Sequence, residues 1–163
     1  MKGLVLLFIS IVFFLGVSAQ QAVKIYNPSA DAKSEIATAI RHAGESGKHV
    51  FIQIGGNWCP WCLRFHKFVH EDAKLDSLLK ADYEVVLVNY SKENENREVL
   101  AGLDYPQRFG YPVFVILDGK GNRIHTQDSG FLEDGIGYSH EKVERLFLLW
   151  SAEAILKTKE KYK

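Results

Sequence analysis

The sequence has no excess charge of either sign and very little cysteine. Its 163 residues include 20 basic and 20 acidic side chains, so the formal net charge is zero. No strong overall field attracts nucleic acid, another polyanion or an anionic membrane, and we exclude these as the main partner. Both cysteines lie in Cys59-Pro60-Trp61-Cys62, so none is left over for a structural disulfide elsewhere.

Long apolar runs are also lacking, except for one near the amino terminus. Residues 3–16 are largely apolar, Lys2 precedes them, and small residues follow. This pattern predicts a signal peptide over residues 1–19, because a run of about 14 residues is too short to span a bilayer. Residues 20–163 then form one domain without a further membrane segment. Residues 159–163 carry no endoplasmic reticulum retention signal, so we expect export to a bacterial periplasm or, alternatively, secretion.

The spacing of apolar residues predicts an α/β fold. Helical periodicity and cap residues predict four helical regions. The first covers 30–45 and is capped by Asn27 or Ser29, and the second runs from Pro60 to 79 with or without an interruption. The third covers 93–100 with Ser91 as its cap, and the last covers 139–155 with Ser139 as its cap. Strands are predicted over 50–54, 84–90, 111–117 and 123–126, and a loop over 130–137. Parallel strands joined by helices and followed by a hairpin predict a central mixed sheet with a terminal antiparallel hairpin and helices on both faces.

The two cysteines follow a predicted buried strand and stand where a helix begins. A disulfide across two intervening residues closes too small a loop to stabilise the fold much, so the pair is interpreted as chemical. Free N–H groups and the positive helix end favour a thiolate at Cys59, which attacks a substrate disulfide, and Cys62 resolves the mixed disulfide. We expect Cys59 to be exposed with a lowered pKa, and Cys62 to be more buried.

The motif Trp58-Cys59-Pro60-Trp61-Cys62 after a buried strand, with Tyr111-Pro112 opening a later strand, resembles the thioredoxin superfamily, in particular exported bacterial proteins of the disulfide isomerase type. The resemblance covers essentially the whole chain after the signal peptide. It implies a thioredoxin-like fold, thiol–disulfide oxidoreductase activity without a cofactor, and a cis peptide bond at Tyr111-Pro112. It also implies a substrate-binding surface, formed by Trp58, Pro60, Trp61, Tyr111 and Pro112.

Two departures from the family pattern concern proton transfer and redox direction. Gln53 stands where thioredoxins carry a buried acid, and Glu71 and His66 are nearby candidate replacements. Strong oxidants of the superfamily place a histidine before the second cysteine, where this chain has Trp61. Its absence favours a reductase or an exchange protein, whose partners are protein disulfides and an unidentified electron donor or acceptor protein.

Two other classes of function stay open at the level of sequence. Cys59, Cys62, His66 and His70 supply metal ligands roughly along one side of a helix, as a metal-binding or metal-delivery protein requires. A non-catalytic thioredoxin-like binding module, in which the fold presents a surface and the redox chemistry is incidental, is the other alternative.

Overall fold

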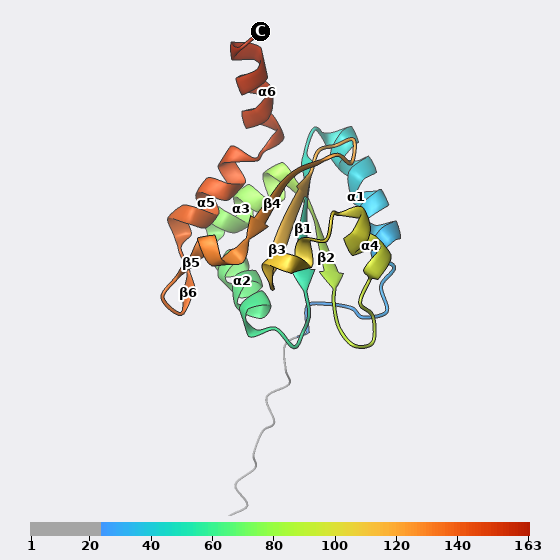
Figure 1. Cartoon of the computed structure of the whole chain (residues 1–163). Coiled ribbons are helices and arrows are strands. Elements are labelled where there is room, and N and C mark those ends of the chain that lie inside the picture. Colours follow the sequence, from blue (N-terminus) through green and yellow to red (C-terminus); the bar gives the residue numbers. More distant parts are fainter. Residues whose placement is uncertain (1–23) are drawn as a thin grey trace, which may run out of the picture.

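The computed structural model describes residues 24–163, and the predicted signal peptide lies outside them (Figure 1). The helices are α1 (Ala32–Ser46), α2 (Pro60–Glu71), α3 (Ala73–Asp82), α4 (Arg97–Gly102), α5 (His140–Leu149) and α6 (Ala152–Lys161). The strands are β1 (His49–Gly55), β2 (Tyr83–Asn89), β3 (Val113–Leu117), β4 (Arg123–Asp128), β5 (Glu133–Asp134) and β6 (Gly137–Tyr138). No helix in this part of the chain has both the length and the apolar character needed to cross a membrane.

Strand β1 has an inner position in a four-stranded sheet of order β2-β1-β3-β4. It runs parallel to β2 and antiparallel to β3, and β3 forms an antiparallel hairpin with β4. The predicted mixed sheet with a terminal hairpin is therefore confirmed.

Two apolar cores separate the sheet from its helices. Figure 1 shows α1 and α4 on one face of the sheet and α2, α3 and α5 on the other. Alternate residues of β1 supply the two cores: Val50 and Ile52 pack with the residues of α1 and α4, whereas Phe51 packs with those of α2, α3 and α5. The prediction of helices on both faces is confirmed, and all of β1 is buried as a consequence.

Several helix ends differ from the prediction because local side chains cap them. Asp31, not Asn27 or Ser29, caps α1 by accepting a hydrogen bond from Ser34 N. Asp72 ends α2 and caps α3, so of the two possibilities left open for residues 60–79 the interrupted helix is the one observed. These caps satisfy backbone N–H groups that the first turn of a helix leaves unpaired.

The prediction that Ser91 caps a helix over 93–100 is wrong. The Ser91 and Asn94 backbones hydrogen-bond to each other in both directions and form a turn. Helix α4 therefore starts later, at Arg97, after Asn96 in a left-handed conformation with φ 48°.

The carboxyl-terminal region also departs from the prediction. The expected loop over 130–137 contains a 3₁₀ turn and the small β5–β6 hairpin. Ser139 does cap α5, but the predicted last helix is interrupted where Ser151 caps a separate helix, α6. Helix α6 has no buried side chain and extends away from the sheet (Figure 1). Ala154 and Ile155 therefore do not extend the buried apolar face of α5.

The core between the sheet and α2, α3 and α5 depends on Phe51. Its ring centroid lies 5.3 Å from that of Phe114 and 5.5 Å from that of Phe147, and its side chain is fully buried. We expect Phe51→Ala to lower the free energy of unfolding by about 3–5 kcal/mol, because it removes these contacts and leaves a cavity. Denaturant unfolding measures the change. Phe131→Ala is the control, with little expected effect since Phe131 is 74% exposed; equal losses would contradict this description of the core.

Candidate active site

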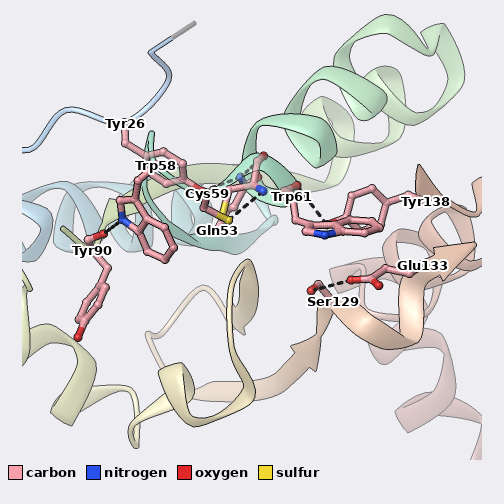
Figure 2. Close-up of a disulfide and its surroundings, with 10 residues drawn as sticks. Tyr26, Gln53, Trp58, Cys59, Trp61, Tyr90, Ser129, Glu133 and Tyr138 are labelled. Carbon is pink, nitrogen blue, oxygen red and sulfur yellow. Dashed lines mark hydrogen bonds between the residues drawn. A yellow bond between two sulfur atoms is a disulfide. The ribbon is translucent and has the colours of Figure 1, made fainter. Parts of the chain in front are cut away.

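The two cysteines form a disulfide at the junction of β1 and α2. Cys59 is the N-cap residue of α2, Pro60 is its first residue, and Cys62 lies one turn into it. The cysteine Cα atoms are 5.3 Å apart (Figure 2). Proline is favoured at this helix position, because its fixed φ suits a helix and its missing N–H leaves no unpaired donor.

The start of α2 directs backbone N–H groups at Cys59. The backbone N–H of Cys62 donates a hydrogen bond to Cys59 Sγ, with an N-to-S distance of 3.1 Å. The same N–H and the positive end of the helix dipole stabilise a negative charge on this sulfur when the disulfide is reduced. Cys59 is therefore the sulfur that the helix activates.

The expected exposure of Cys59 is not observed in the disulfide form. Cys59 is 3% exposed and Cys62 is 0% exposed. The order of burial agrees with the prediction, but the prediction that Cys59 is exposed is wrong. Residues from the amino-terminal segment and from the loop before β3 cover the pair: Ile25, Tyr26 and Tyr111 pack against it.

Asn57 holds the amino-terminal segment over the disulfide. Its Oδ1 accepts hydrogen bonds from the backbone N–H groups of Ile25 and Tyr26 at 2.9 and 3.0 Å, and its Nδ2 donates to the Tyr26 carbonyl at 2.8 Å. A side chain two residues before Cys59 thus fixes a segment about thirty positions earlier in the chain. The Tyr26 ring is placed against the sulfurs as a result.

Gln53, at the position where thioredoxins carry a buried acid, is buried in β1, and its amide nitrogen makes two hydrogen bonds. Its Nε2 donates to Tyr26 Oη at 2.7 Å and to the Cys62 carbonyl at 3.1 Å (Figure 2). Burial raises the pKa of Tyr26, so its hydroxyl stays neutral at physiological pH. Gln53 therefore links the Tyr26 hydroxyl to α2 through two hydrogen bonds.

Aromatic side chains form a rim on one side of the disulfide. Trp58 is 55% exposed, and its indole N–H donates to the Tyr90 carbonyl at 2.6 Å. Its ring meets Tyr111 edge to face at 5.4 Å, and Tyr111 stacks on Tyr90 at 5.0 Å. Burial, followed by the neighbouring Tyr90, raises the pKa of Tyr111. The structure thus brings together Trp58 and Tyr111, two residues that the sequence predicted for the site.

Trp61 forms the rim on the other side, against the β5–β6 hairpin. Its ring meets Tyr138 edge to face at 5.5 Å, and the Tyr138 hydroxyl donates to the Trp61 carbonyl at 3.2 Å. The guanidinium of Arg64 lies over the Trp61 ring, 4.6 Å from its centroid. Figure 2 shows Ser129 and Glu133 below this pair.

The Tyr111-Pro112 peptide bond is cis, as predicted. Pro112 is buried and immediately precedes Val113, which pairs with Ile54 near the end of β1. The antiparallel register of β1 and β3 therefore brings the proline loop to the same end of the sheet as the cysteines.

The histidines of α2 do not join the cysteines in a metal site. The His66 and His70 rings lie 4.3 Å apart, and His70 Nδ1 is 2.6 Å from Asp76 Oδ1. Burial, and then the charge of His70, lower the pKa of His66. Within residues 24–163, no three or more His, Cys, Asp or Glu side chains form a group arranged to hold a metal ion.

Sequence reasoning did not identify Tyr26, Asn57 or Tyr138 as parts of this site. Tyr26 and Tyr138 lie far from the motif along the chain and reach it only through tertiary contacts. The partners of Asn57 are the backbone groups of Ile25 and Tyr26, about thirty positions earlier, so its role also depends on tertiary contacts.

Comparison with known proteins places the fold in a family. A family model described as thioredoxin-like matches residues 31–119, which is more than half of the chain. The chain belongs to this thioredoxin-like family. The matched range contains the cysteine pair and the cis proline.

Individual relatives are more distant. The thiol:disulfide interchange protein DsbD of Ralstonia nicotianae is 26% identical over 98 residues, which is 60% of this chain and 16% of that protein. The chain thus spans less than a fifth of that relative. The disulphide isomerase of Xylella fastidiosa Temecula1 is 23% identical, with a TM-score of 0.69 over 77% of this chain and 95% of that one. A DsbH oxidoreductase is 18% identical, with a TM-score of 0.53 over 68% and 77%.

The solved structures share the fold of this chain. Membership in the thioredoxin-like family, together with the close-set Cys59–Cys62 pair at a helix N-terminus, supports thiol–disulfide oxidoreductase activity.

Gly55 provides a direct test of the packing beneath the disulfide. A Cβ at this position would overlap Cys62 Sγ and stand 2.9 Å from Tyr26 Oη. We expect Gly55→Ala to lower the free energy of unfolding of the oxidised protein by about 1–3 kcal/mol, because the crowded atoms must shift. Gly102→Ala is the control: a Cβ there meets nothing within 4 Å, and a change within about 1 kcal/mol is expected. A Gly55→Ala protein as stable as the wild type would contradict the packing described.

Proposed function

We propose that this protein reduces or exchanges disulfides in exported proteins through the Cys59–Cys62 dithiol. The observation that carries the proposal is the position of Cys59 as the N-cap of α2, with a backbone N–H donated to its sulfur. Cys59 is the nucleophile and Cys62 the resolving cysteine. No cofactor is needed, because the two sulfurs carry both electrons.

The reaction proceeds in two exchanges. The Cys59 thiolate attacks one sulfur of a client disulfide, a bond forms between them, and the other client sulfur leaves as a thiolate that takes a proton from solvent. Cys62 then loses its proton and attacks Cys59, which releases the second client thiolate. The client gains two electrons, and the pair ends as the disulfide seen in the structure.

The residue before Cys62 supports the reducing or exchanging direction. Trp61 stands where a histidine would stabilise the thiolate and make the disulfide more oxidising. The nearest cation to this ring is Arg64, which lies over its face. Without a charged neighbour between the cysteines, the dithiol form is less favoured and gives up its electrons more readily.

Client proteins are proposed to bind at the aromatic rim. Trp58 and Pro60 are exposed beside the buried sulfurs, and Trp61 and Tyr111 are partly exposed around them. Pro112, the remaining predicted binding residue, is buried next to Tyr111 in the disulfide form. The partners are protein disulfides and a second redox protein that resupplies electrons. We further propose that residues 20–163 form one thioredoxin-like domain, exported to a bacterial periplasm by the predicted signal peptide of residues 1–19.

Trapping of mixed disulfides tests the roles of the two cysteines. Reduced Cys62→Ser protein is expected to accumulate a covalent adduct with insulin or another disulfide-containing client, because no second sulfur releases it. Non-reducing electrophoresis detects the adduct, and excess dithiothreitol should remove it. Cys59→Ser, which also keeps one thiol, is the matched control and should trap little. Equal trapping by the two variants would mean that Cys59 is not the dedicated nucleophile.

The reduction potential of the pair tests the direction. Equilibration with glutathione is expected to give a value nearer to the −270 mV of thioredoxin than to the roughly −120 mV of a strong oxidant. Trp61→His should raise the potential by about 30 mV or more, equivalent to about tenfold in the equilibrium constant, because the imidazolium stabilises the thiolate. A wild-type value near −120 mV would instead indicate an oxidase.

A further inference from the structure

The hydroxyl of Tyr26 is the polar group buried against the inner side of the disulfide. Tyr26 is buried together with Cys59 and Cys62 in one cluster. A Cβ on Gly55 would crowd both Cys62 Sγ and Tyr26 Oη, so these two atoms border the same small space. The reaction described above assigns no role to this hydroxyl.

The hydrogen bonds of Gln53 determine where the Tyr26 proton points. The Cys62 carbonyl can only accept, so the Gln53 atom 3.1 Å from it must be the amide nitrogen. The same nitrogen lies 2.7 Å from Tyr26 Oη, which therefore accepts from it. The Tyr26 hydroxyl proton is consequently directed to a different acceptor.

We propose that in the reduced protein the Tyr26 hydroxyl donates a hydrogen bond to the Cys62 thiolate. The Tyr26–Gln53 pair, at the place where thioredoxins carry a buried acid, then stabilises the resolving sulfur. This inference rests on the proposed function, since it concerns the resolving step. In the disulfide form the sulfur is uncharged and a weak acceptor; reduction and deprotonation make it the strongest acceptor in the cluster.

Tyr26 is not consumed in this step. The Cys62 thiol proton passes to solvent, and the thiolate electron pair forms the bond to Cys59 while the client sulfur leaves with the electrons of the broken bond. The Tyr26 O–H remains intact and lowers the free energy of the thiolate before it attacks. A charge-assisted hydrogen bond of this kind is stronger than a neutral one.

Few other groups near Cys62 can titrate or carry charge. Of the residues that the structure describes, no Asp, Glu, Lys or Arg is buried. The loop before β3 contributes Tyr111, and β6 contributes Tyr138, whose hydroxyl donates to the Trp61 carbonyl. Helix α2 contributes His66, one turn beyond Cys62, and Arg64, whose guanidinium lies over the Trp61 ring. β1 and β2 contribute neutral Gln53 and Leu87. Tyr26 is the tyrosine that is buried in one cluster with Cys62, while Tyr138 and Arg64 have partners of their own.

The experiment measures the Cys62 pKa in full-length Cys59→Ser protein, from the ultraviolet absorbance of the thiolate against pH. Adding Tyr26→Phe is expected to raise this pKa by about one unit or more, which is about a tenfold lower thiolate fraction at neutral pH. Tyr83→Phe is the matched control. It removes the hydroxyl of another buried tyrosine, which donates a hydrogen bond to the Phe147 carbonyl in the core between the sheet and α2, α3 and α5. This change should leave the Cys62 pKa unchanged.

Gln53→Leu in the same background keeps the inference testable if Tyr26→Phe does not fold. Without the amide, the Cys62 carbonyl loses its donor and competes for the Tyr26 proton, so the Cys62 pKa should again rise. An unchanged pKa in whichever of these variants folds would overturn the inference. Because the readout is one thiol without a client, a protein that fails to reduce client disulfides would contradict the proposed function and leave this result standing.

Discussion

The central position of β1 is the constraint on which the rest of the site depends. Its parallel pairing with β2 and its antiparallel pairing with β3 hold the end of the strand and the start of β3 side by side. Helix α2 begins five residues after β1, so its N-terminus and the cis proline before Val113 meet at one edge of the sheet. A shift of either register by one residue would exchange the two faces of the strand and separate the sulfurs from the proline loop.

Burial of the disulfide follows from how this edge is closed. Asn57 binds the backbone of Ile25 and Tyr26, and the amino-terminal segment covers one side of the sulfurs, while Tyr111 covers another. Covering the pair in this way reduces its contact with water, which strengthens each hydrogen bond that a sulfur there receives.

The parts of the fold that the sequence predicted are those encoded over short distances. The four strands of the main sheet, the first helix and the cysteine motif depend on periodicity and on neighbouring residues, and they were predicted close to their observed limits. The late start of α4 follows from the turn between Ser91 and Asn94, and the break before α6 follows from the cap at Ser151. In both places polar side chains and turns compete with the helix, and the spacing of apolar residues does not decide the outcome. The contacts of Tyr26 and Tyr138 with the cysteine motif could not be predicted, because only the folded structure brings these residues to the motif.

The replacement of a buried acid by Gln53 changes the electrostatics of the resolving step. A carboxyl group beside Cys62 would itself titrate, and when ionised its charge would oppose the formation of a thiolate nearby. The amide has no charge at any pH, and burial raises the pKa of Tyr26, so its phenol stays neutral over the physiological range. A neutral donor stabilises the thiolate without that repulsion. The site therefore has no carboxylate at this position that could remove the Cys62 proton. The stability of the resolving thiolate, in turn, does not depend on the ionisation of a neighbouring carboxyl group.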